Sequence, residues 1–309
     1  MSERASPTRS RVALTLEWLG CATFRVRVKG LTLFFDTFVD RIPSAEPVGV
    51  RSGEITRADF VFISHAHFDH ILGADTIAKN TGAPVVGSYE TIRVLRENGV
   101  AAEQLWAVSG GETIDCGRGV SVRAYPALHS CLWAAAGADA GAACLGELAV
   151  PYQERRAGTE RVIDALIATT PEIDECVGAV ETRVSRADGG QLNYLLNTPE
   201  GSLLISASAG YWSGIMRELR PDVAVLALAG RPNLDGEPFQ GSHAQFIAGE
   251  VETLRPRRVV LCHHDAWLPP LPAMDVEPVA RELALRTPRA ELVSLAYSDP
   301  VAVLRTRRL

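Results

Sequence analysis

The sequence has no feature that marks a disulfide-rich secreted protein or a membrane protein. Its six cysteines show no C-x-x-C spacing, and in a chain of 309 residues they suit reduced, mostly buried thiols. No apolar run reaches the roughly eighteen residues that a membrane-spanning helix needs. The N-terminal stretch MSERASPTRSR contains no apolar signal-peptide region, so we expect a cytoplasmic protein without a membrane span. The cysteines are Cys21, Cys116, Cys131, Cys144, Cys176 and Cys262.

The chain also lacks an excess of positive charge. It has 31 Lys and Arg residues against 37 Asp and Glu residues and a net charge of −6, which argues against a nucleic-acid partner. A Gly-x-Ser-x-Gly turn, a Gly-x-Gly-x-x-Gly loop and a Walker loop are all missing, so neither a serine hydrolase nor a nucleotide-binding enzyme is indicated. A small-molecule substrate is the expected partner, and no pattern assigns an oligomeric state.

Strand and helix patterns predict one α/β domain over residues 1–309. Runs rich in β-branched and aromatic residues, separated by glycine, predict strands within 12–39, and strand and helix patterns then alternate. Residues 131–188 differ, because this alanine-rich stretch favours helices and contains no histidine. Strand patterns resume in a hairpin that turns at 199–201 and alternate with helices up to about residue 304. We therefore expect an α/β domain with a helical insertion at 131–188.

Three of the seven histidines lie within six positions, in the stretch FISHAHFDH. The stretch follows a buried strand pattern, and at a strand end His65 and His67 can project to the same side and bind one ion. Asp69 and His70 then offer an oxygen and a nitrogen to a second ion. Imidazole and carboxylate groups suit zinc, manganese or iron. A polar surface turn would explain the composition, but this spacing directly after a buried strand favours a metal site.

The pattern H-x-H-x-D-H after a strand resembles the signature of the metallo-β-lactamase superfamily. The stretch LEWLGCATFRVRVKGLTLFFDTFV is similar to the opening of the ascorbate-6-phosphate lactonase-like and N-acyl-phosphatidylethanolamine phospholipase-like branch. In that branch the second strand leads to an aspartate, which is Asp36 here. The resemblance implies a four-layer αββα sandwich with metals at one edge of its two sheets.

The resemblance also implies further ligands. His129, at the end of the strand pattern VRAYPALHS, matches the histidine that completes the first metal site with His65 and His67. The last ligand should follow the final core strand. There the stretch VVLCHHDAW selects His263, with His264 as the alternative.

One ligand implied by the resemblance is missing. The family's aspartate that bridges both metals corresponds to Ser208, whose neutral hydroxyl is a weaker ligand than a carboxylate. The second site of Asp69, His70 and His263 should therefore bind metal less tightly than the first. We expect one or two Zn²⁺ ions, with Mn²⁺ or Fe as alternatives.

Five further residues are candidates for supporting or substrate-binding roles. Asp36 suits orientation of a metal-bound imidazole better than direct ligation. His243 opens a predicted helix, where a solvent-facing position is favoured over one at the mouth of the site. Trp133, Tyr211 and Trp212 follow predicted strands near the metals and are equally explained as core aromatics or as a substrate wall.

These residues predict a metal-dependent hydrolase. A metal held by histidines with an open position makes hydroxide available near neutral pH, and Asp69 would orient it as the catalytic carboxylate. The substrate would be an ester, lactone or phosphoester with an apolar part, covered by the 131–188 insertion as a lid. Two alternatives stay open: a mononuclear iron oxygenase of the sulfur dioxygenase type, and a degenerate metal-binding protein without activity.

Overall fold

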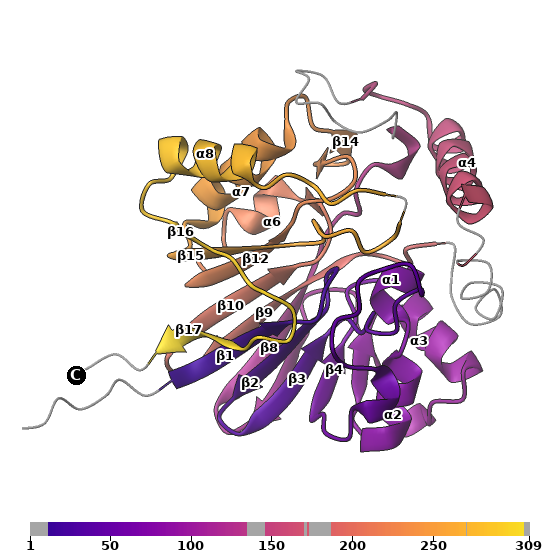
Figure 1. Cartoon of the computed structure of the whole chain (residues 1–309), viewed down its shortest axis with the longest axis vertical. Helices are drawn as coiled ribbons and strands as arrows, with labels where there is room; N and C mark the ends of the chain where they lie inside the picture. Colours follow the sequence, from indigo (N-terminus) through magenta and orange to yellow (C-terminus); the bar gives the residue numbers. More distant parts are fainter. Residues whose placement is uncertain (1–11, 135–145, 170–171, 173–186, 270, 306–309) are drawn as a thin grey trace, which may run out of the picture.

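The computed structural model describes residues 12–134, 146–169, 172, 187–269 and 271–305. Two mixed sheets face each other across an apolar core, and helices cover the outer face of each sheet (Figure 1). This confirms the predicted four-layer αββα sandwich. The core between the sheets includes Phe24, Phe35 and Phe62 from one sheet and Tyr194 and Val225 from the other.

The first sheet has seven strands. In spatial order they are β17 (Val301–Arg305), β1 (Val12–Trp18), β2 (Phe24–Val28), β3 (Leu31–Phe35), β4 (Phe60–Phe62), β5 (Val85–Gly87) and β6 (Leu105–Ala107). Strands β17 to β3 pair antiparallel, whereas β3 to β6 are parallel. In β2 the residues alternate between the core and the outside, while all five residues of β3 are buried because helices cover its outer face.

The second sheet also has seven strands. In spatial order they are β16 (Glu291–Val293), β15 (Arg258–Cys262), β12 (Val223–Ala227), β10 (Gly201–Ser206), β9 (Leu192–Thr198), β8 (Val120–Pro126) and β7 (Thr113–Gly117). The strands from β10 to β16 are parallel, so their carboxyl ends meet at one edge. A small third sheet joins β11 (Gly210–Tyr211), β13 (Asn233–Leu234) and β14 (Glu237–Pro238).

Two groups of helices form the outer layers. The first sheet is covered by α1 (Phe68–Ile71), α2 (Ala74–Thr81) and α3 (Tyr89–Glu97), and the second by α6 (Ser213–Met216), α7 (His243–Leu254) and α8 (Glu277–Arg286). Local signals set the starts of two of them: Ser88 caps α3, and Ser242 and Gln245 form a capping box on α7. Short 3₁₀ turns lie at η1 (Ser52–Glu54), η2 (Ala102–Gln104) and η3 (Leu132–Ala134).

The described part of the predicted insertion at 131–188 is largely helical. It contains η3 and the long helix α4 (Tyr152–Thr169), which lies beside the sandwich on the same side as α1 (Figure 1). Gly158 lets α4 approach η3, since a Cβ there would lie 2.9 Å from the Cβ of Trp133. Arg155 also ties α4 to the β13–β14 turn through a 2.6 Å ion pair with Glu237. Residues 135–145, 170–171 and 173–186 of the insertion lie outside the described residues.

Candidate metal centre

The histidine motif lies where the chain leaves β4 and enters α1. His65 and His67 belong to the loop, and His67 is the extended residue directly before the helix, with φ −67° and ψ 150°. Asp69 and His70 lie inside α1 and are buried. The motif is therefore part loop and part helix rather than a strand end alone. This change of conformation directs the first two imidazoles and the next two side chains to different positions.

The first cluster brings together His65, His67 and His129. Their ligand nitrogens all lie within 4.8 Å of one another, and Nδ1 of His67 is 3.2 Å from Nε2 of His129. Two nitrogens that bind one zinc at about 2.1 Å with a tetrahedral angle lie about 3.4 Å apart, so this spacing fits a shared ion. His129 follows β8 by three residues, as the sequence predicted for the end of that strand.

A buried nitrogen with no partner supports the same assignment. Nε2 of His65 is buried and has no hydrogen-bond partner among the described residues, although such a group normally finds one. Its Nδ1 lies 3.0 Å from the Ser64 hydroxyl, so Nε2 is the nitrogen left for a ligand. In His129, Nδ1 lies 2.9 Å from the Ser130 carbonyl and donates to it, which leaves the Nε2 lone pair toward His67. The donor set therefore fits a metal ion.

The pKa values of this cluster favour the neutral imidazoles that metals bind. Burial lowers the pKa of His65 well below its usual value, and the neighbouring histidines lower it further. Burial also lowers the pKa of His129 to about 4, with His67 as the next cause. Both side chains consequently keep a free lone pair at neutral pH.

A second cluster surrounds the carboxylate of Asp69. Its Oδ2 lies 3.1 Å from Nε2 of His263 and 3.3 Å from Nε2 of His70. Burial opposes ionisation of Asp69, but His70 and His263 lower its pKa well below the usual value, so it is a carboxylate. Burial likewise opposes a charged His70, yet Asp69 and Asp36 raise the pKa of His70 to about 10. Two carboxylates thus create a place that favours positive charge, which is what a dication requires.

Asp36 holds His70 in position through the other ring nitrogen, Nδ1. Its carboxylate accepts hydrogen bonds from Nδ1 of His70 at 2.7 Å, from the Ser64 amide at 2.7 Å and from the Ser64 hydroxyl at 2.8 Å. Nε2 of His70 is then the nitrogen that faces Asp69. Asp36 reaches His70 from the side opposite Asp69, because β3 pairs with β4 and ends beside the motif. A residue that orients an imidazole would make such a contact, and this role stays a prediction.

The two adjacent histidines after β15 point to different places. His263, with φ 62°, faces Asp69 and packs edge-on against Trp267 at 5.0 Å between ring centroids. His264 instead stacks on Trp18, with the rings 4.9 Å apart and inclined by 13°. The cluster around Asp69 therefore contains His263, while His264 supports the neighbouring core.

Ser208 lies next to the first cluster rather than within either group of ligands. It is buried, and its hydroxyl accepts a 3.2 Å hydrogen bond from the Ser130 amide, directly after His129.

The prediction that His243 faces solvent is wrong, because its side chain is buried and its Nε2 bonds to the Gly230 carbonyl. The start of α7 packs on the loop after β12, and this contact between distant segments covers the helix end.

The three candidate aromatics have different surroundings. Tyr211 is a core residue, 6% exposed and packed on Phe246 at 5.2 Å. Trp212 is 39% exposed at the start of α6. Trp133 lies in η3 and packs against α4, where the guanidinium of Arg155 is 4.7 Å from the centroid of its ring.

An apolar wall lies beside the second cluster. Phe38, Phe68 and Trp267 pack on one another with ring centroids about 6 Å apart, and Trp267 also contacts His263. Leu166 of α4 belongs to the same apolar group. The described part of the insertion thus reaches the neighbourhood of the candidate metal ligands.

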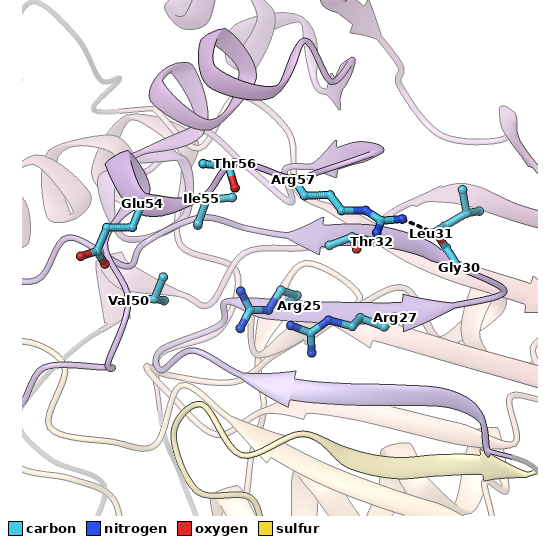
Figure 2. A pocket seen from close by; sticks show the side chains of 10 residues that line it. All are labelled: Arg25, Arg27, Gly30, Leu31, Thr32, Val50, Glu54, Ile55, Thr56 and Arg57. Atoms are coloured by element: carbon cyan, nitrogen blue, oxygen red, sulfur yellow. Dashed lines mark hydrogen bonds between the residues drawn. The ribbon is translucent and has the colours of Figure 1, made fainter.

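A separate cavity of about 280 Å³ lies on the outer side of β2 and β3, and Figure 2 shows Arg25, Arg27 and Arg57 among its lining residues. Arg25 and Arg27 both pair with Glu17, and Arg57 donates to the Gly30 carbonyl at 2.6 Å. None of the candidate metal ligands lines this cavity. Its arginines already have partners, so we assign no substrate to it.

Cys21 is a residue near the ligands that the sequence did not single out. It lies in the turn between β1 and β2, is fully buried, and its sulfur, a carboxylate oxygen of Asp69 and a nitrogen of His263 lie within 4.8 Å of one another. Burial raises the pKa of its thiol well above the usual value, and Asp69 and Asp265 add to the effect. Its place in the turn W-L-G-C was visible in the sequence, but nothing there showed that the turn reaches His263.

Part of the chain is similar in sequence to known proteins. Residues 32–157, from β3 into α4, match the beta-lactamase superfamily domain. The chain is 37% identical over 118 residues to a UPF0173 metal-dependent hydrolase of Pyrobaculum calidifontis, a match that covers 38% of this chain and 51% of that protein. The chain thus spans about half the length of such relatives.

Two solved structures show that the fold extends over nearly the whole chain. Igni18, a metallo hydrolase from Ignicoccus hospitalis, superimposes with a TM-score of 0.60 at 17% identity, over 93% of this chain and 97% of that one. CmlA, a diiron beta-hydroxylase from Streptomyces venezuelae, superimposes with a TM-score of 0.54 at 16% identity, over 96% of this chain and 55% of that one. Within the described residues no helix is both long and apolar enough to cross a membrane. Residues 32–157 thus match the beta-lactamase superfamily domain, and the sandwich of two sheets is the fold that the chain shares with these solved structures.

Proposed function

We propose that this protein is a metal-dependent hydrolase whose first metal, zinc, is held by His65, His67 and His129. The observation that carries the proposal is the buried Nε2 of His65, which lacks a hydrogen-bond partner among the described residues and belongs to a group of three converging imidazoles. Burial keeps His65 and His129 neutral, and three histidines are a ligand set of catalytic zinc sites. The names of the matched relatives support the same activity.

The chemistry divides between the metal and Asp69. A dication held by these histidines would lower the pKa of a bound water and polarise the scissile oxygen of the substrate. Asp69 remains ionised at neutral pH because His70 and His263 stabilise its charge. Its carboxylate can therefore orient the attacking water, take a proton at an oxygen and return it to the leaving group. His70 is held by Asp36 and in turn fixes Asp69.

For the substrate we propose an ester, lactone or phosphoester with an apolar part. The support is the wall of Phe38, Phe68 and Trp267 beside His263, which α4 extends through Leu166. Helix α4 with η3 would act as a lid that excludes water from the bound substrate. A cytoplasmic location belongs to the same proposal, since the four cysteines of the described residues are all free and buried.

A variant at His67 tests the proposal. In His67→Ala the first site loses one of three ligands, so metal affinity should fall by more than the 10–100-fold typical of residues that only orient ligands. Metal content and turnover should be measured on a panel of lactones, aryl esters and phosphodiesters. His264→Gln is the matched control, because His264 stacks on Trp18 outside both clusters. Full metal occupancy and turnover in His67→Ala would refute the assignment.

The identity of the bound metal separates the alternatives. Zinc or manganese with hydrolysis of a panel substrate supports the proposal. Tightly bound iron with oxygen consumption would favour an iron oxygenase instead, a reaction class that the superfamily fold also accommodates. A purified protein that binds none of these metals would indicate a degenerate site.

A further inference from the structure

We propose that the second metal site of this protein is a thiolate site, in which Cys21 binds a thiophilic dication together with Asp69 and His263. This inference deepens the proposed function, because it rests on Asp69 and its neighbours being metal ligands. It differs from the site that the family resemblance implies, in which a carboxylate after β10 bridges the two metals. Cys21 comes instead from the turn between β1 and β2.

Distance and burial bring the three ligands together. The sulfur of Cys21, a carboxylate oxygen of Asp69 and a nitrogen of His263 lie within 4.8 Å of one another. Zinc binds sulfur at about 2.3 Å and nitrogen at about 2.1 Å, so a tetrahedral ion needs such atoms about 3.6 Å apart. A small closing movement therefore completes the site. The nitrogen of His263 that faces Asp69 is Nε2, which lies 3.1 Å from Oδ2 of Asp69.

The backbone holds Cys21 and His263 as one unit. The carbonyl of Cys21 accepts hydrogen bonds from the His263 amide at 2.8 Å and from the Trp18 indole at 2.9 Å. Cys21 and His263 both adopt left-handed backbone conformations, with φ of 47° and 62°. Non-glycine residues are uncommon in this region, and here two that are far apart in the sequence lie side by side. The strain is maintained where two candidate ligands meet.

A buried ion pair fixes the same turn from the other side. Both carboxylate oxygens of Asp265 lie 3.1 Å from the Cys21 amide and accept its hydrogen bond. Asp265 is itself held by the guanidinium of Arg41 at 2.7 Å and by the hydroxyl of Tyr297 at 2.6 Å. Because these groups clamp the main chain, the Cys21 side chain remains directed at α1, where its sulfur lies 3.7 Å from the Asp69 carbonyl.

The charge of the second site favours a thiolate ligand. Ser208 is neutral at the position where the resemblance implies a bridging carboxylate, so the second site loses one negative charge. When Cys21 binds the metal, its S–H proton is released to solvent and a sulfur–metal bond forms. Asp69 and the Cys21 thiolate then supply two negative charges to one dication. Thiolate ligation also predicts that the site prefers zinc or cobalt over manganese.

Cobalt titration of the intact protein tests the inference. We expect the metal-free protein to bind two equivalents of Co²⁺, the second giving a near-ultraviolet band of thiolate-to-cobalt charge transfer. In Cys21→Ser the first equivalent should bind as in the wild type, the band should disappear, and the second equivalent should bind at least 10–100-fold more weakly. Cys116→Ser is the control, since the Cys116 thiol makes a similar 3.9 Å contact with a carbonyl on β7, away from both clusters.

A measurement without any variant covers the case in which Cys21→Ser does not fold. Zinc X-ray absorption of wild-type protein loaded with two equivalents should show sulfur at about 2.3 Å. Two bound equivalents with no sulfur signal, or a band that persists in Cys21→Ser, would overturn the thiolate assignment and leave the first site intact. Failure to bind either metal would overturn both the thiolate site and the proposed function.

Discussion

Replacing Asp36 with asparagine should weaken the second metal site without removing a metal ligand. Asp36 is 1% exposed, and its carboxylate accepts three hydrogen bonds of 2.7 to 2.8 Å, two from Ser64 and one from Nδ1 of His70. Asparagine keeps the size and tolerates the φ of 54° at this position. However, an amide accepts through only one of its two terminal atoms, so at least one of the three donors must lose its acceptor, and two lose it if the oxygen stays on the Ser64 amide.

The consequence for His70 can be worked out from these contacts. If the amide oxygen stays on the Ser64 N–H, the NH₂ group faces Nδ1 of His70, and the imidazole must move its proton to Nε2. Nε2 then has no lone pair to offer as a further ligand of the second metal, besides Cys21, Asp69 and His263. If the amide turns the other way, the buried Ser64 N–H loses its acceptor, which costs about 1–3 kcal/mol. We expect the affinity of the second metal to fall about 10–100-fold, or about 1.4–2.8 kcal/mol.

Zinc titration against a competing chelator measures this loss, and ¹⁵N spectra of the histidine side chains report the tautomer of His70. Asp222→Asn is a suitable control, because Asp222 accepts from the Ser202 amide at 3.0 Å but contacts neither cluster. Circular dichroism would establish that both variants are folded. A folded Asp36→Asn protein with wild-type affinity for the second metal would show that Asp36 does not orient His70.

Three further changes address other parts of the molecule. Ser208→Asp should tighten the second metal-binding step, since it adds an anion beside Ser130 and His129; an unchanged zinc titration would mean that Ser208 does not correspond to the bridging position. Shortening the 131–188 insertion with a glycine–serine bridge should leave metal content near wild type and raise KM for large substrates; loss of metal from a folded variant would refute the lid. Burial raises the pKa of Glu250 to about 8, so the folded protein keeps a proton that the unfolded chain releases, and stability should fall by a few kcal/mol as the pH rises from about 4.5 to 8. Glu250→Gln should remove this loss in urea unfolding at several pH values, and identical pH dependence in both proteins would contradict it.

Much of the fold followed from local patterns in the sequence. The alternation of β2, the continuous apolar run of β3 and the capping residues of α7 each reflect contacts within one segment or one face. The shared position of the His65 motif, His129 and His263 was also predictable, because each follows a strand whose end reaches the same edge. What made that prediction specific was the resemblance to a family, since spacing alone does not bring residues 129 and 263 together.

The residues that the sequence analysis missed or misjudged depend on long-range contacts. Cys21 and Asp265 are 244 positions apart, and only the folded chain shows that one holds the amide of the other. His243 has the local pattern of an exposed helix start, yet the loop at Gly230 covers it. For Tyr211 the sequence left a core position and a substrate wall equally open, and Phe246 of α7 completes its burial. In each case a segment distant in sequence determines the environment.

Because the ligands come from segments that are distant in the sequence, a metal site can persist while one ligand changes position. A dication needs negative charge within a few ångströms, but it does not matter which loop supplies that charge. At the edge of this sandwich, the turn after β1, the motif after β4 and the residue after β15 all reach Asp69 or its neighbours. A loss at Ser208 can therefore be offset by a thiolate at Cys21 without a change in the fold. The turn that contains Cys21 is held by Asp265 and Arg41, far from the histidine motif in sequence, and this support makes the substitution of one ligand by another structurally feasible.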